Sequence, residues 1–396
     1  MTLPPQEIPP QVQTSRNRIL LGVSLGLSVL TLLFGLYWFF YARFYKFTDD
    51  AYVAGNTVMV TAQVPGIITT IYAQDADFVT KGTPLVQIDP TDHQIALNAL
   101  VNDLGNQVRD VAKLFFSVET TKADILAQKA LLNKKIEDFE RRKALIPSNA
   151  VSQEDFMHSK YDMENQEANV LALENTLLGL EAQTENTTIE THPKVLSLIQ
   201  KVLQAYINLK RCTLYAPVTG VVAQRTVQVG KWVAVTEPLL SVVPLDQMWI
   251  EANFKETQLS RVRVGQPVKI QSDIYGHSVE YSGVVAGVGG GTGSAFSVLP
   301  PQNATGNWIK IVQRVPVRID LSRTMLEEFP LRVGLSMLVT VDTTQDQGSM
   351  TAQPRDVDTI RFATDIYANE EAGALELIRQ TIETNLSLEA KDLESK

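Results

Sequence analysis

Two stretches of this chain repeat one pattern: Val60–Pro90 reads VTAQVPGIITTIYAQDADFVTKGTPLVQIDP, and Leu214–Pro244 reads LYAPVTGVVAQRTVQVGKWVAVTEPLLSVVP. They align without a gap when one is shifted by 154 positions. Eight positions are then identical: Ala62/Ala216, Val64/Val218, Gly66/Gly220, Gln74/Gln228, Val79/Val233, Pro84/Pro238, Leu85/Leu239 and Pro90/Pro244. Both copies are rich in β-branched residues and are divided by turn signals. The repeat therefore predicts two β-rich halves of one module.

The spacing within each copy resembles a half-motif of the biotinyl/lipoyl fold, in which two halves pack about a pseudo-twofold axis. In carrier proteins of that fold a hairpin tip presents a lysine, in a Met-Lys or Asp-Lys context, for attachment of a cofactor. Neither copy has such a lysine. We therefore expect residues 60–90 and 214–244 to form the two halves of a lipoyl-like β-sandwich with no cofactor. Two unrelated hairpins with chance matches are the alternative, and the gapless register argues against it.

The insert between the halves, residues 91–213, has a helical pattern. Between Pro90 and Pro147 there is no proline, and Gly105 is the only glycine. Fifteen positions from 97 to 146 are spaced alternately four and three residues apart, and twelve of them are apolar. The exceptions are Lys122, Lys129 and Lys143. A repeat of 3.5 residues held over this length predicts a coiled coil. The apolar positions are Leu97, Val101, Leu104, Val108, Val111, Phe115, Val118, Ile125, Leu132, Ile136, Phe139 and Ile146.

A return arm follows the helix breaker at residues 146–150. Ser152 is a predicted N-cap, and the apolar pattern then resumes, with an interruption near Asn186–Pro193. Because one tight turn joins the two arms, they must be antiparallel neighbours, with the tip at about residues 141–152. An arm of about fifty-five residues would reach roughly 80 Å at 1.5 Å per residue. A compact helical domain is the alternative, and the absence of breakers in the first arm argues against it.

One apolar segment precedes the repeat. Residues 19–42 carry no charge, and about twenty apolar residues suffice to cross a bilayer as a helix. We expect an uncleaved transmembrane anchor here, because the segment is too long for a signal peptide and no small-residue cleavage site follows it. Basic residues are nearly balanced on its two sides, so a cytoplasmic tail over residues 1–18 is favoured only by the free amino terminus. Residues 43–59 are then expected to be a linker and the first strand of a β-barrel.

The carboxyl-terminal third divides into two parts. Residues 245–345 contain several short segments of alternating polarity with no helix between them, which predicts a small β-barrel. The glycine-rich run at 287–293 lacks the features of a phosphate loop or a dinucleotide fingerprint, so we interpret it as a loop. Residues 346–396 are acidic and are expected to be a weakly ordered tail, with one amphipathic helix indicated by Leu375, Ile378, Ile382 and Leu386.

Composition excludes several classes of activity. Thirty-five basic against forty-four acidic residues give a net charge of −9, which argues against nucleic acid as a partner. A single cysteine, Cys212, excludes an internal disulfide or a cysteine-rich metal cluster, and the four histidines are scattered. Two pairs of nearby carboxylates, Asp49/Asp50 and Asp75/Asp77, are interpreted as solvated surface groups. Since no set of nucleophile, base and orienting residue stands out, we expect no enzymatic activity, no cofactor and no metal.

Taken in order, these elements resemble the periplasmic adaptor (membrane fusion protein, HlyD-like) family, in its branch linked to multidrug pumps of the major facilitator class. The resemblance covers about residues 43–345. It is carried by TDDAYVAGN (Thr48–Asn56), IDPTD (Ile88–Asp92), MWIEANFKETQL (Met248–Leu259) and GTGSAFSVLPPQNATGNWIKIVQRVPVRI (Gly291–Ile319). The fold class implied is mixed α and β and elongated: a transmembrane helix, a split lipoyl-like β-sandwich, a long antiparallel coiled-coil hairpin and a small β-barrel.

The resemblance also implies a function and a site. Such adaptors are anchored in the inner membrane, extend into the periplasm, assemble as trimers or hexamers, and link an inner-membrane transporter to an outer-membrane channel like TolC. In adaptors that bind TolC, the hairpin tip carries an Arg-x₃-Leu-x₆-Ser pattern, which Arg141, Leu145 and Ser152 match. Two alternatives remain open: an adaptor of an ABC-type protein secretion system, and a membrane-tethered biotinyl or lipoyl carrier.

Overall fold

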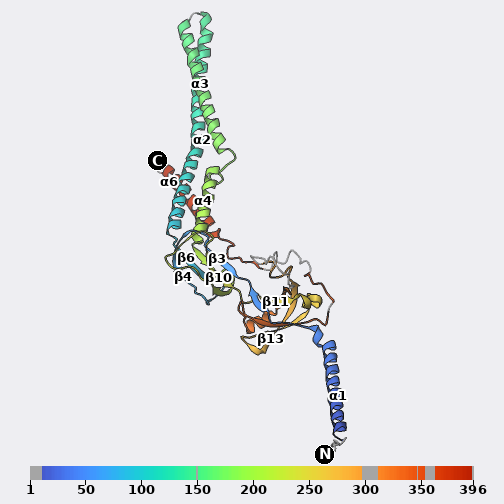
Figure 1. Ribbon diagram of the computed structural model, residues 1–396. Coiled ribbons are helices and arrows are strands. Elements are labelled where there is room, and N and C mark those ends of the chain that lie inside the picture. Colours follow the sequence, from blue (N-terminus) through green and yellow to red (C-terminus); the bar gives the residue numbers. More distant parts are fainter. Residues whose placement is uncertain (1–10, 149, 297–310, 346, 353–361, 395–396) are drawn as a thin grey trace, which may run out of the picture.

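The computed structural model describes residues 11–148, 150–296, 311–345, 347–352 and 362–394. The chain is elongated (Figure 1), with helix α1 (Gln11–Phe40) at one end and a helical hairpin at the other. The β-strands of the described residues lie between these two ends. The predicted class, an elongated mixed α and β protein with an apolar helix, a split sandwich, a hairpin and a barrel, is confirmed.

The two halves of the repeat form one module of two four-stranded sheets. The strands are β3 (Val58–Thr61), β4 (Gly66–Ile71), β5 (Phe78–Val79) and β6 (Pro84–Ile88), then β7 (Thr213–Tyr215), β8 (Gly220–Ala223), β9 (Trp232–Val233) and β10 (Pro238–Val243). The sheet orders are β3-β10-β8-β5 and β7-β6-β4-β9. The shift of 154 positions places β4 on β8, β5 on β9 and β6 on β10, so it converts one sheet order into the other. Each sheet therefore contains strands from both halves.

The core of this module repeats the same symmetry. Equivalent residues of the two copies are buried together: Ala62 with Ala216, Ile68 with Val222, Val79 with Val233, Leu85 with Leu239, and Ile88 with Val242. Close packing requires a glycine at the equivalent positions Gly66 and Gly220. A Cβ at Gly66 would meet the side chain of Ile88, and a Cβ at Gly220 would meet the backbone carbonyl of Val243. Neither half can bury its apolar face alone, so the two copies must fold as one unit.

A seven-stranded sheet forms the second β unit, in the order β1-β15-β12-β13-β14-β11-β2. Its strands are β1 (Tyr45–Thr48), β2 (Ala51–Gly55), β11 (Met248–Lys255), β12 (Pro267–Ser272), β13 (Gly276–Val288), β14 (Arg314–Leu321) and β15 (Met337–Asp342), with the short helices η3 (Glu256–Arg261) and α5 (Arg323–Glu328). The sheet curls on itself, because Val53 N–H donates to the Leu335 carbonyl at 2.9 Å and Gly334 N–H donates to the Val53 carbonyl at 2.8 Å. The segment before the repeat thus supplies two barrel strands.

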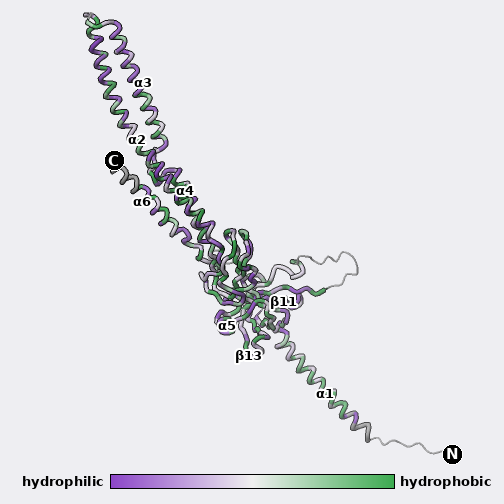
Figure 2. Tube along the Cα trace, turned by 90° about the vertical axis from the view of Figure 1, so that its left-hand side faces the viewer, coloured by the Kyte–Doolittle hydropathy of each residue, from purple (hydrophilic) through white to green (hydrophobic). Residues whose placement is uncertain are grey.

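The insert folds as a long helical hairpin that leaves the repeat module (Figure 1). The outgoing arm is α2 (Thr91–Leu145), a helix of 55 residues, followed by the turn η2 (Ile146–Ser148). The return arm consists of α3 (Gln153–Thr184) and α4 (Pro193–Lys210). The break between them falls at the interruption that the sequence predicts. Figure 2 shows α2 and α3 side by side, and below the break α2 packs on α4.

The carboxyl-terminal segment differs from its prediction. Residues 346–396 were expected to be weakly ordered, yet α6 (Ala372–Glu394) is a helix that packs on α2 and α4 at the base of the hairpin. Ile378 and Ile382 are 5% and 6% exposed and belong to the same apolar core as Leu104, Val108 and Val202 of the hairpin. The predicted amphipathic helix therefore exists, and burial of its apolar face orders this part of the tail.

Candidate functional site

The two arms of the hairpin are held together by a narrow apolar seam. Every buried α2 side chain larger than alanine lies at a predicted heptad position: Leu97, Leu104, Val108, Val111, Val118 and Ile125. Nearer the tip the seam is thinner and includes a stacked pair, Phe139 and Phe156, with ring centroids 5.4 Å apart. A thin seam stabilises a two-helix rod but leaves most of the helix surface exposed to solvent or to partners.

Two of the three lysines that interrupt the heptad pattern form ion pairs between the arms, whereas Lys143 pairs with Glu140 of its own helix at 3.3 Å. Lys122 lies 3.6 Å from Glu181, and Lys129 lies 2.7 Å from Glu174. A third pair joins Lys135 to Asp162 at 2.7 Å, and this contact lowers the pKa of the Asp162 carboxyl. Exposed pairs of this kind add little stability each, but their complementary charges favour a single register of the two arms.

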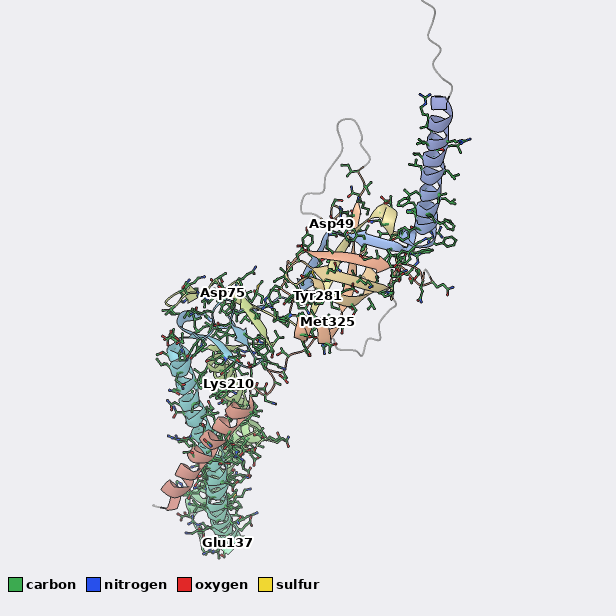
Figure 3. The ribbon with its side chains drawn as sticks, turned by 90° about the horizontal axis from the view of Figure 1, so that it is seen from below. Asp49, Asp75, Glu137, Lys210, Tyr281 and Met325 are labelled. Carbon is green, nitrogen blue, oxygen red and sulfur yellow. The ribbon has the colours of Figure 1, made fainter. Side chains whose placement is uncertain are left out.

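The predicted docking residues lie at the far end of this rod, beside the turn. Arg141 and Leu145 are one helical turn apart in the last two turns of α2, so they share one face of the helix. Ser152 begins the return arm as the N-cap of α3: its hydroxyl accepts a hydrogen bond from Asp155 N–H at 3.1 Å and donates to the Asp155 carboxylate at 2.6 Å. Figure 3 shows Glu137 close to the same end, far from the labelled residues of the β units.

Arg141 and Leu145 are accessible to a partner. The side chain of Arg141 is 68% exposed and has one intrahelical ion pair, with Asp138 at 3.0 Å. Leu145 is 40% exposed at the helix end. Its neighbour Arg142 is engaged instead, because its guanidinium donates to the Asp155 carbonyl at 3.1 Å and ties the two arms together. A surface pair within one helix is worth roughly 0.3–0.5 kcal/mol, so Arg141 can exchange Asp138 for a partner's carboxylate or carbonyl groups.

Three of the four acidic residues noted in the sequence have partners within the protein. Asp75 accepts a hydrogen bond from Arg225 N–H at 2.9 Å, and Asp77 accepts one from Gln74 N–H at 2.8 Å. Asp50 forms an ion pair with Arg314 at 2.9 Å, while Asp49 is exposed (Figure 3). Among the residues that the structure describes, no group of three metal-ligating side chains comes together.

A second contact region, which the sequence did not reveal, joins the carboxyl-terminal segment to the hairpin base. Arg211 donates two hydrogen bonds to the carboxylate of Glu370, at 3.0 and 3.2 Å, and Lys81 of the repeat module lies 2.5 Å from Asp365. Thr364 donates to the Pro217 carbonyl at 2.8 Å. These contacts fasten residues 364–370 across the repeat module before α6 begins.

Glycines mark the places where α6 meets the hairpin. A Cβ on Gly105, the one glycine of α2, would stand 2.8 Å from Asn385, and a Cβ on Gly373 would collide with the hydroxyl of Tyr206. Arg109 also donates to the Asn385 side chain at 2.9 Å. A lone glycine within a long helix costs stability unless a neighbour needs the space. Gly105 was therefore the available sequence signal for this contact, but it did not identify the segment that fills the space.

Known proteins resemble this chain along most of its length. The family model for the α-helical hairpin domain of EmrA matches residues 91–212. The multidrug export protein EmrA of Haemophilus influenzae is 40% identical over 373 residues, which are 94% of this chain and 95% of that protein. EmrA of Escherichia coli K12 is 43% identical over 318 residues, 80% of this chain and 82% of that protein. A solved structure of the periplasmic adaptor protein EmrA covers 76% of this chain and 99% of its own, with a TM-score of 0.40 at 20% identity. The chain belongs to the periplasmic adaptor (membrane fusion protein, HlyD-like) family, in its EmrA branch.

Proposed function

We propose that this protein is the periplasmic adaptor subunit of a tripartite multidrug efflux pump. In this proposal it links an inner-membrane transporter of the major facilitator class, similar to EmrB, to a TolC-like outer-membrane channel. The protein catalyses no reaction itself, and the transporter supplies the energy. The relatives named multidrug export protein EmrA support the export role.

The observation that carries this proposal is the placement of two features at opposite ends of the molecule (Figure 1). At one end, the segment Arg18–Phe44 contains an 18-residue window with a mean hydropathy of 2.4, and none of that window is buried, which fits a helix surrounded by lipid. At the other end, the hairpin tip presents Arg141 and Leu145. The 55 residues of α2 alone extend roughly 80 Å. A chain built in this way can hold one end in a membrane and reach a partner far above it.

The tip has the chemistry for binding the helical ends of a channel. A guanidinium can fork onto carboxylates or free backbone carbonyls, and the Leu145 side chain can fill an apolar groove between two helices. Ser152 is already engaged with Asp155, so we assign it chiefly to holding the turn in shape while Arg141 and Leu145 bind.

We further propose that the subunits assemble as a ring of three or six. Large apolar side chains stand exposed along the hairpin and on the repeat module, where neighbouring subunits of a ring would lie. Examples on the hairpin are Leu126, Leu171 and Leu178, which are 70%, 58% and 63% exposed. Phe78 and Trp232 on the repeat module are 63% and 59% exposed. Burial of such side chains between subunits is a common source of stability in oligomers.

Charge reversal at the tip tests the docking residues. Arg141→Asp or Leu145→Asp should abolish drug export and channel crosslinking, because each places a carboxylate where the proposal requires a cation or an apolar contact. Lys113→Asp is the matched control: Lys113 is an exposed residue about eight turns down the same helix, with only a 3.6 Å pair to Asp110. Recovery of the inner-membrane transporter should be unchanged in all three variants.

Full drug resistance in both tip variants would show that the channel is bound elsewhere. If crosslinking to the transporter were lost together with crosslinking to the channel, the tip variants would be acting through misfolding. Far-UV circular dichroism and the yield of membrane-inserted protein separate that case from a loss of docking.

A further inference from the structure

The junction between the apolar helix and the barrel is short and firmly held. Helix α1 ends at Phe40, the turn η1 (Ala42–Phe44) follows, and β1 begins at Tyr45. The Phe44 carbonyl accepts two hydrogen bonds from buried Thr343, one from its N–H at 2.9 Å and one from its hydroxyl at 2.6 Å. These bonds fix the turn to the end of β15, so the base of the barrel stays at a set height above the end of α1.

Helix η3 is also held at the junction between α1 and the barrel. Gln258 of η3 donates from its side chain to the Phe47 carbonyl of β1 at 2.9 Å. Arg261, the last residue of η3, lies with its guanidinium carbon 5.3 Å from the centroid of the Phe44 ring. Arg43 lies over the same ring at 4.8 Å and over Phe39 at 4.5 Å. Two guanidinium groups therefore share one phenyl ring at the junction.

Among the residues that the structure describes, no anionic group balances these two charges. Within the described part of the chain, neither Arg43 nor Arg261 has a carboxylate within ion-pairing distance, and the Nε of Arg43 is buried without a hydrogen-bond partner. Stacking on an aromatic ring uses the face of a guanidinium and leaves N–H groups in its plane free to bind an oxyanion. Two like charges held near one ring repel each other, and an anion bound beside them would reduce that repulsion.

The position of this pair along the anchor identifies the anion. The uncharged run at residues 19–42 spans roughly 36 Å as a helix, slightly more than the roughly 30 Å hydrocarbon core of a bilayer. Arg43 is the next residue, so it lies in the headgroup layer, where the amphipathic rings of Trp38 and Tyr41 also favour the interface. Phosphate groups are the abundant oxyanions of that layer, and a guanidinium binds them through paired hydrogen bonds.

We propose that Arg43 and Arg261 form a binding site for the phosphodiester group of an anionic phospholipid, in the leaflet that faces the barrel. An anionic lipid fits better than a zwitterionic one, because the site already holds two uncompensated positive charges. A lipid bound here would fix the barrel against the membrane surface and would set the direction in which the hairpin projects. This inference rests on the proposed membrane anchorage by α1 and is independent of docking to a channel.

The test uses the full chain in nanodiscs that contain equal amounts of phosphatidylglycerol and phosphatidylcholine. Native mass spectrometry of the released protein counts the lipids that remain bound. The wild-type protein should retain phosphatidylglycerol in excess of its share, and Arg43→Gln and Arg261→Gln should each reduce that enrichment about fivefold. Arg263→Gln is the matched control: Arg263 is half-buried two residues beyond Arg261, but its guanidinium donates to the Val262 carbonyl at 2.8 Å. It should behave as wild type.

Arg261→Gln is the decisive variant, because Arg43 also packs between two rings and its loss can disturb the junction. Unchanged enrichment in Arg261→Gln, or an equal loss in Arg263→Gln, would overturn the proposal. Excess inorganic phosphate should leave the enrichment intact; if phosphate abolished it, the site would bind a soluble oxyanion and the lipid assignment would be wrong. Cosedimentation with vesicles tests the anchor separately, because it depends on α1 and should survive in every variant.

Discussion

Replacing Ile378 by alanine should release helix α6 from the base of the hairpin. The Ile378 side chain is 5% exposed and shares the core formed by Leu104, Val108 and Val202. Truncation of a buried isoleucine costs roughly 2–5 kcal/mol, because transfer energy is lost and a cavity remains. α6 is a terminal element, so it can leave its site without unfolding the rest of the chain. The cost should therefore appear as local release of this helix.

Amide hydrogen exchange measured by mass spectrometry is the appropriate assay, since it reports the free energy of local opening for each segment. A loss of 2 kcal/mol at the lower limit corresponds to exchange about thirtyfold faster in residues 372–386. Leu375→Ala is the matched control, because Leu375 lies on the same helix but is 56% exposed. Its exchange should stay within about twofold of wild type.

Equal acceleration by Leu375→Ala would refute the reasoning, because the helix would then not be held by the face that contains Ile378 and Ile382. Rapid exchange of α6 already in the wild-type protein would also refute it. If α2 and α4 open together with α6, the three helices form one cooperative unit. The free energy lost in Ile378→Ala is then compared with the free energy of opening of that whole unit.

Three other outcomes follow from the structure. Burial, with a smaller contribution from Asp89, raises the pKa of Cys212 to about 11. This thiol should therefore resist labelling by maleimide near pH 8 until the protein is denatured. Stoichiometric labelling of the native protein would contradict its burial. The hydrogen bond from Lys81 lowers the pKa of Asp365, so the contribution of this pair is present above the ordinary aspartate pKa and is lost as the pH falls through the lowered value. Proteolysis near residues 362–371 should then increase in acid, and Lys81→Met should remove that pH dependence; an unaltered profile would exclude the pair as its origin. A reporter enzyme fused after residue 345 should be active only in the periplasm, and cytoplasmic activity would reverse the proposed orientation.

The sequence predicted those parts of the fold that depend on a repeated pattern. The shift of 154 positions revealed the split module because each buried position has an equivalent in the other copy, as Leu85 and Leu239 illustrate. The heptad revealed the hairpin for the same reason, and its lysine exceptions at 122 and 129 now have partners on the return arm. The tip location follows from the turn, whereas the binding role of Arg141, Leu145 and Ser152 stays a prediction.

Contacts between distant segments could not be predicted in this way. An amphipathic pattern in residues 375–386 shows that one face must be buried, but it does not show which surface covers that face. The docking of α6 depends on complementary surfaces from two segments that are distant in the sequence, as where Asn385 fills the space at Gly105. The Arg43 and Arg261 pair was missed for a similar reason, because more than two hundred positions separate the residues that share the Phe44 ring.

These long-range contacts determine where the molecule is stiff. The barrel is fixed to the end of α1 by the bonds of Thr343 to Phe44, and the base of the hairpin is braced by α6 as a third helix. Beyond the break at residues 185–192 the rod consists of two helices, α2 and α3, with a thin apolar seam. Bending stiffness falls when the number of packed helices falls and one backbone is interrupted. Adjustment of the tip toward a partner should therefore occur at residues 185–192, while the anchor keeps its orientation to the barrel and α6 keeps the base of the hairpin rigid.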